Sequence, residues 1–152
     1  MFINDYQMDI SSIDELNVQA WEQRRVDLRH SFELGMKVKE VAGELDYKKG
    51  IADSSKVLGY CYWRFSDYSL SLTHSLIAIE FYRKNNLKKD EADTLNSIGA
   101  VYMFQKEHAK RLDCNMQCLK IREEVEDKEG VAGSMNNIGE TYFEMSDMTN
   151  AM

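Results

Sequence analysis

A repeat of 40 residues is the feature of this 152-residue chain that most restricts its fold. When the chain is aligned with itself at that offset, small, aromatic and aliphatic residues superpose in four columns across three copies. The columns are Gly59, Gly99 and Gly139; Tyr62, Tyr102 and Tyr142; Ala52, Ala92 and Ala132; and Leu58, Ile98 and Ile138. A repeat of this length is one supersecondary unit that buries its apolar face against its neighbours. The sequence therefore predicts a stack of similar units.

A more divergent copy precedes these three. At an offset of 80, apolar residues between Phe32 and Leu45 fall on apolar residues between Leu112 and Val125. We therefore predict about three and a half repeats in a single domain over residues 1–152. The predicted repeats span roughly 12–47, 48–87, 88–127 and 128–152, the last of them incomplete.

The apolar spacing within each copy is helical. Ala92, Leu95, Ile98 and Tyr102 follow one another in steps of three or four, which places them on one face of a helix. The chain contains no proline, which favours uninterrupted helices. We predict an all-α fold of seven helices, two antiparallel helices to a repeat. Their predicted ranges are 12–25, 28–44, 48–65, 67–85, 88–105, 107–126 and 128–145.

The repeated glycines lie in the middle of predicted helices. Glycine costs about 1 kcal/mol relative to alanine there, so its recurrence needs a compensating reason. We predict that Gly59, Gly99 and Gly139 allow the second helix of each hairpin to approach the first closely.

The segments 96–102 (Asn-Ser-Ile-Gly-Ala-Val-Tyr) and 136–142 (Asn-Asn-Ile-Gly-Glu-Thr-Tyr) resemble the first-helix signature of tetratricopeptide repeats, in a long form of about 40 residues. Asp67-Tyr68 is similar to the turn before the second helix of that family. The resemblance implies a right-handed α-solenoid of antiparallel helix hairpins. Two positions depart from the pattern: Arg111 replaces the small residue represented by Ser71, and Gln19 replaces the signature glycine.

The resemblance implies a protein–protein or peptide interaction module. Long-form repeats of this kind are similar to those in front of output domains of bacterial signalling proteins, so we expect a sensory, regulatory or scaffolding role in the cytoplasm. In this family the first helices line a concave face, which implies the partner-binding residues given next. They are Lys56, Tyr60, Trp63, Arg64, Asn96, Met103, Phe104, Asn136, Glu140 and Phe143.

This set combines an apolar strip with asparagines that can pair with the backbone of an extended peptide. An alternative is that Trp63 and Met103 pack between neighbouring repeats. The acidic residues at the same face, with Lys56 as its one lysine, disfavour a clamp for a carboxylate. They favour a peptide that carries Lys or Arg around an apolar anchor. The acidic residues are Asp53, Asp93, Glu140 and Glu144.

A second hypothesis is structural self-association, as a homodimer or a longer stack. The last predicted helix has an apolar face but no following helix to cover it, and such faces need a cap or a partner. That face comprises Met135, Ile138, Tyr142 and Met145. The same observation predicts that the chain is a fragment of a longer protein.

The charge and hydropathy of the chain exclude several other classes. A formal charge of −7 and a pI near 5.0 oppose binding to nucleic acid. No run approaches the roughly 20 apolar residues of a spanning helix, and the start lacks the pattern of a secretion signal, so we expect no membrane insertion.

No residue pattern indicates an enzyme, a cofactor or a metal site. Cys114 and Cys118 are four residues apart, with His108 nearby, but zinc needs about four ligands and close cysteine pairs usually follow a C-x2-C spacing. Cys118 aligns with Ala78, which favours a small core residue. We also find no triad spacing and no phosphate-binding glycine loop.

Overall fold

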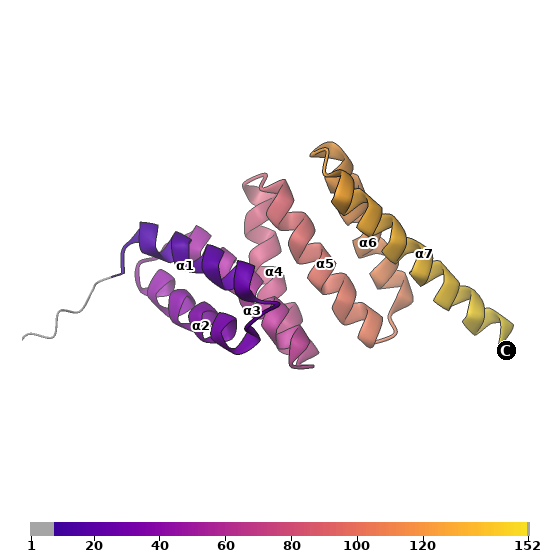
Figure 1. Cartoon of the computed structure of the whole chain (residues 1–152), viewed down its shortest axis with the longest axis horizontal. Helices are drawn as coiled ribbons and strands as arrows, with labels where there is room; N and C mark the ends of the chain where they lie inside the picture. The colour runs from indigo at the N-terminus through magenta and orange to yellow at the C-terminus, as the bar shows by residue number, and fades with distance from the viewer. Residues whose placement is uncertain (1–7, 152) are drawn as a thin grey trace, which may run out of the picture.

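The computed structural model describes residues 8–151. Within that range the chain is all-α, with seven helices and no strand, as the sequence predicts (Figure 1). The helices are α1 (Ile10–Gln23), α2 (Leu28–Glu44), α3 (Lys48–Arg64), α4 (Tyr68–Lys84), α5 (Lys88–Phe104), α6 (His108–Glu124) and α7 (Lys128–Asn150).

The 40-residue repeat corresponds to two helices and two short loops. The helices α2 to α6 have 17 residues each, and from α3 to α7 each helix begins 20 residues after the one before it. The first and last predicted ranges differ most from the structure, and the other five agree with it to within two residues at each end. The helix predicted at 12–25 is α1 at Ile10–Gln23, because Asp9 caps its amino end through Ser12 N. The last helix runs to Asn150 rather than to residue 145, so α7 extends beyond α6 at one end of the molecule (Figure 1).

The loops from α2 onward share one conformation. Asp46, Ser66, Asn86, Lys106 and Glu126 have φ between 51° and 63°, the left-handed region. In the fourth of these loops, Lys106 N donates to Met103 O at 3.1 Å and Glu107 N donates to Tyr102 O at 2.9 Å. These two bonds form the Schellman motif that satisfies the last carbonyls of a helix. The motif usually has glycine at the left-handed position, and none of these loops has one.

Replacing Lys106 with glycine is therefore expected to stabilise the protein by about 1 kcal/mol, because glycine removes the steric cost of the left-handed conformation. Urea unfolding followed by circular dichroism measures the gain. Lys110→Gly, in the exposed first turn of α6, should instead lose up to about 1 kcal/mol. An equal loss in both variants would contradict the interpretation of the loops.

Each helix packs against the helices before and after it in the chain, and α3 also contacts both α1 and α5. The hydrophobic clusters combine side chains from consecutive helices: Ile79 of α4 packs with Leu95 of α5 and Cys118 of α6. The helix α3 is the most enclosed, since every residue from Ser54 to Cys61 is buried. Because α3 contacts both α1 and α5, these three helices form one continuous layer.

The predicted close approach at the glycines is confirmed for two of the three. A Cβ atom at Gly59 would collide with Ser75 Oγ and lie 3.3 Å from the backbone of α4 at Ser71 and Ser75. At Gly99 it would lie 3.2 Å from Asn115 Oδ1 of α6. At Gly139 it would have no such neighbour within 4 Å in the described chain. The face of α7 that corresponds to the packed faces of α3 and α5 is thus uncovered in residues 8–151.

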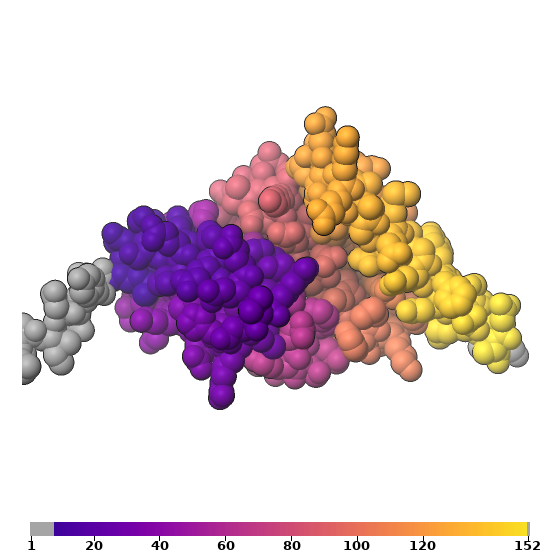
Figure 2. All heavy atoms as spheres, viewed as in Figure 1, coloured from indigo at the N-terminus to yellow at the C-terminus, as the bar shows by residue number. Residues whose placement is uncertain are grey.

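Polar contacts hold α7 to the rest of the molecule, from which it projects in Figure 2. Its buried residues are Ser134 and Thr141, and neither is apolar. Arg122 of α6 donates to Gly130 O and Ser134 Oγ, both at 3.0 Å. Arg111, which is 3% exposed, reaches two glutamates of α7. Arg111, which departs from the repeat pattern, is therefore one of the two arginines that join α6 to α7.

No helix within residues 8–151 is long and apolar enough to cross a membrane.

Candidate functional site

An aromatic ladder crosses the layer formed by α1, α3 and α5. It consists of Trp21 at the end of α1, Tyr60 and Trp63 at the end of α3, Phe104 at the end of α5, and Tyr68 at the start of α4. These residues meet because α1, α3 and α5 lie side by side. We refer to these five side chains as the aromatic ladder.

The rings of the ladder contact one another in sequence. Trp21 and Tyr60 meet edge to face with centroids 6.0 Å apart, and Tyr60 meets Trp63 in the same way at 5.3 Å. Trp63 lies 6.3 Å from Phe104, and Phe104 stacks on Tyr68 at 6.0 Å with an interplanar angle of 19°. Tyr60 is buried and Trp63 half-buried, whereas Phe104 is 55% exposed. Trp63 therefore both packs against a neighbouring repeat and borders the exposed end of the ladder.

Two arginines flank the ladder. Arg64 Nη1 donates to the hydroxyl of Tyr60 at 3.2 Å, and its guanidinium lies 5.7 Å from the Trp63 centroid. Arg24, from the end of α1, stacks 3.6 Å above the Trp21 ring. Burial, with the nearby charge of Arg25, lowers the pKa of Arg24. Cations against aromatic faces are a favourable arrangement that also holds the rings in place.

The remaining predicted partner-binding residues lie on α5 and α7. Met103 is half-buried beside Phe104. Asn96 Oδ1 accepts from Asn137 Nδ2 at 3.4 Å, and Asn136 Nδ2 donates to Glu140 Oε1 at 3.1 Å. Both predicted asparagines thus make contacts within the chain. Glu140 also accepts from Arg111, whereas Phe143 is exposed on α7 without an aromatic partner in the described residues.

A charged hollow of about 320 Å³ lies beside the ladder, between α1, α3 and α5. Its lining includes Asn17, Trp21, Asp53, Lys56, Asp90 and Asp93. Lys56, predicted as a partner contact, is only 7% exposed because it lies within this hollow. Its Nζ atom donates to Asp90 Oδ1 at 2.7 Å and lies 4.3 Å from the Trp21 centroid.

Hydrogen bonds and ion pairs fix the carboxylate of Asp53 at one side of the hollow. The buried Tyr82 donates its hydroxyl to Asp53 Oδ1 at 2.7 Å, and Lys49 Nζ donates to Asp53 Oδ2 at 2.7 Å. Burial lowers the pKa of Lys49, but Asp53 and Asp14 together outweigh that effect and raise the pKa. Burial, followed by the charge of Asp53, raises the pKa of Tyr82. Both carboxylate oxygens of Asp53 therefore accept hydrogen bonds from side chains of this chain.

Asp93 differs from Asp53. No hydrogen bond or ion pair joins its carboxylate to another group within residues 8–151. Burial raises the pKa of Asp93, only partly opposed by the charges of Lys56 and Arg122. The hollow thus contains one half-buried carboxylate that has no hydrogen-bond or ion-pair partner in the described residues.

Comparison with models of protein families and with curated proteins gives no match. The functional interpretation therefore depends on the geometry of this chain.

The predicted self-association residues lie on α7. Met135 is 60% exposed and Tyr142 is also exposed, whereas Ile138 and Met145 are half-buried. The two exposed side chains lie on either side of Gly139, which has no covering neighbour in the described chain. This face remains open in a monomer.

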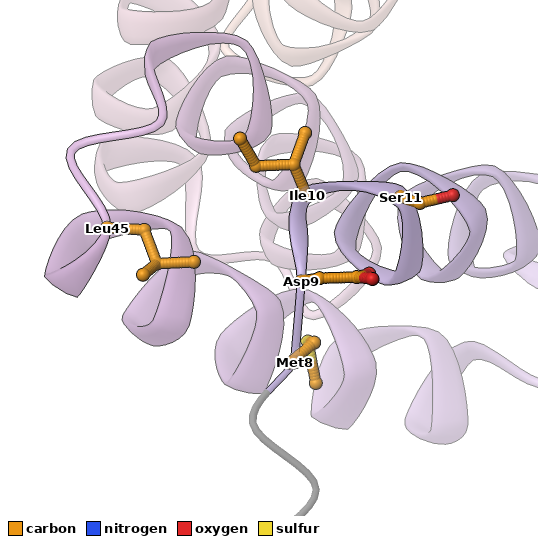
Figure 3. Close-up of a pocket in the computed structure, with 5 residues that line it drawn as sticks. All are labelled: Met8, Asp9, Ile10, Ser11 and Leu45. Atoms are coloured by element: carbon orange, nitrogen blue, oxygen red, sulfur yellow. The ribbon is translucent and has the colours of Figure 1, made fainter.

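A second hollow lies where α1 begins, next to the loop after α2 (Figure 3). Its side chains are mainly apolar, from Met8, Ile10 and Leu45. The backbone N–H of Ser12 donates to the Asp9 carboxylate, and this hydrogen bond lowers the pKa of Asp9. Ser11 supplies the other polar side chain of this lining.

The cysteines lie in the core. Cys61, Cys114 and Cys118 are free and buried, and Cys118 Sγ contacts Ala92 O at 3.3 Å. Burial raises the pKa of Cys114 to about 11 and those of Cys61 and Cys118 to about 12. The thiols are therefore protonated at neutral pH, which makes them poor nucleophiles and poor metal ligands. Within residues 8–151, no three His, Cys, Asp or Glu side chains are grouped for a metal.

The sequence analysis did not identify Trp21, Arg24 and Asn17, because it locates concave-face residues by their distance from the signature glycines. The first repeat has Gln19 in place of that glycine, so no concave-face residue was assigned on α1. The available signal was the spacing of Asn17, Trp21 and Arg24 along one face of α1.

Proposed function

We propose that this chain is a protein-interaction module of the tetratricopeptide-repeat type that binds a peptide or a neighbouring domain across α1, α3 and α5. The regular spacing of the helices and the contacts between α1, α3 and α5 support a right-handed α-solenoid with these helices on its concave side. The observation that carries the proposal is the aromatic ladder, which ends in the exposed Phe104. Large aromatic side chains beside arginine are typical of binding hot spots.

We place this module in the cytoplasm, as a sensory, regulatory or scaffolding part of a bacterial signalling protein. The support is the resemblance of its repeat motifs. The proposed role requires no catalysis, cofactor or nucleic acid.

The test uses peptides selected from a random library on the immobilised protein. Phe104→Ala is expected to weaken the selected peptides at least tenfold, because truncating a hot-spot aromatic costs about 2 kcal/mol or more. Phe65→Ala is the matched control, since Phe65 is similarly exposed but packs on Phe32, away from the ladder. Isothermal titration calorimetry gives both affinities. Equal affinities of the two variants for the selected peptides would contradict the proposal.

A second candidate function is self-association through α7, favoured by the uncovered surface around Gly139. Sedimentation velocity over a concentration series is the measurement. If this function is correct, wild-type protein dimerises and Met135→Lys with Tyr142→Glu remains monomeric, because charges in an apolar contact must be desolvated. A wild-type monomer at the highest concentration would exclude it.

A further inference from the structure

Lysine side chains of this chain already line the charged hollow, and Lys56 lies against the Trp21 ring with its ammonium on Asp90. The guanidinium of Arg24, which is not part of the lining, stacks on the same ring. Lys56 remains there although it is almost fully buried. An aromatic wall next to carboxylates is thus an arrangement in which this fold stabilises a lysine side chain out of bulk water.

Two acceptors in the hollow have no donor. The Asp93 carboxylate is one of them, as described above. The other is Asn17, which is 3% exposed: its Nδ2 atom donates to Gly50 O at 3.2 Å, but its Oδ1 atom has no hydrogen-bond partner. A buried acceptor without a donor is unfavourable unless a ligand or water supplies one. Of the two, the half-buried Asp93 carboxylate is the acceptor that an N–H group of a ligand can reach directly, since Asn17 Oδ1 is enclosed in this structure.

The charges of the lining leave an excess of negative charge. Lys49 is paired with Asp53 and Lys56 with Asp90. The other charged residues of the lining are Glu22, Asp93 and Lys89, so the lining by itself carries a net charge of −1. The exposed Lys89 can turn toward solvent. The hollow therefore favours a cation over an anion.

The hollow and the aromatic ladder share Trp21. A peptide that contacts Phe104 and continues along the ladder past Trp63 and Tyr60 brings another of its side chains to Trp21. A hollow of about 320 Å³ is at the small end of ligand pockets, a size suited to one side chain rather than to a large ligand.

We propose that the charged hollow between α1, α3 and α5 is a subsite for one lysine or arginine side chain of the bound peptide, with Asp93 as its main acceptor and Trp21 as its wall. This inference rests on the proposed function and specifies the chemistry of the partner.

The probe is N-acetyl-lysine methylamide, and its control is N-acetyl-norleucine methylamide, which has the same stem without the ammonium. In a ¹⁵N NMR titration the lysine compound should shift the Trp21 indole and Asp93 amide resonances saturably, and the norleucine compound should not. Asp93→Asn should weaken the lysine compound at least fivefold. Glu123→Gln, an equal charge change on an exposed residue of α6, should leave its affinity unchanged.

The fold of Asp93→Asn is checked separately. Its Tm should not fall, because the variant removes a charge that burial disfavours. Equal shifts by the lysine and norleucine compounds, or equal affinities in Asp93→Asn and Glu123→Gln, would overturn the subsite.

The subsite and the proposed function can fail independently. If Phe104→Ala weakens the selected peptides while Asp93→Asn leaves both them and the lysine compound unaffected, the subsite is wrong and the interaction surface stands. If Asp93→Asn abolishes binding of the lysine compound but Phe104→Ala leaves the peptides unaffected, the subsite stands without the ladder.

Discussion

The double variant Glu140→Gln with Glu144→Gln is expected to lose about 2 kcal/mol of stability. Arg111 Nη1 lies 3.0 Å from Glu144 Oε2 and its Nη2 lies 3.3 Å from Glu140 Oε2. Without both carboxylates a buried guanidinium has no counter-charge, which typically costs 3–5 kcal/mol. We expect less because the glutamates are half-exposed and glutamine still accepts hydrogen bonds. Urea unfolding measures the loss.

The loss should be concentrated in α7, because this helix is the terminal one in the described chain and buries no large apolar side chain. Hydrogen exchange should accelerate in α7 and remain slow in the enclosed α3. The matched control is Arg111→Met, which removes the buried charge itself and should lose less than the double variant. A larger loss for Arg111→Met would show that Arg111 acts through packing rather than through its charge.

Gly59→Val is expected to destabilise the protein by about 3 kcal/mol. The new side chain would occupy space already filled by Ser75 and by the backbone of α4, so α3 and α4 would have to separate. Thermal unfolding followed by circular dichroism shows the effect as a lower Tm.

Gly139→Val is the matched control, because it is the same substitution at the equivalent position of a later repeat. It should change stability by less than about 0.5 kcal/mol, since a Cβ atom at Gly139 has open space and valine is the better helix former. A comparable loss at both positions would mean that flexibility of glycine, rather than close helix approach, matters at Gly59. If self-association through α7 is correct, Gly139→Val should also weaken the dimer.

The candidate site was only partly predictable. Counting from Gly59 and Gly99 identified Tyr60, Trp63 and Phe104, which the structure brings into one ladder. It did not identify Trp21, whose ring begins the ladder and forms a wall of the charged hollow. Repeat alignment fails where a repeat diverges, and the first repeat lacks the glycine that sets the register.

The repeat pattern did not predict the contact between Glu140 and Arg111. The repeat pattern assigned Glu140 to the binding face and gave no role to Arg111, because the family pattern has a small residue there. The structure pairs the two across α6 and α7. A long side chain can reach a helix that its alignment position does not indicate, and this reach is set by the three-dimensional path of the chain.

The sequence by itself determined that the chain is all-α, the number of helices in residues 8–151 and most of their boundaries. These properties depend on apolar steps of three and four residues and on a repeat of 40, which are local or periodic signals. Only the tertiary structure decided which side chains meet. Asp93 and Trp21 line one hollow, and Gly59 is covered while Gly139 is open. Such contacts join residues far apart in the chain, and they depend on how each helix is rotated against its neighbours.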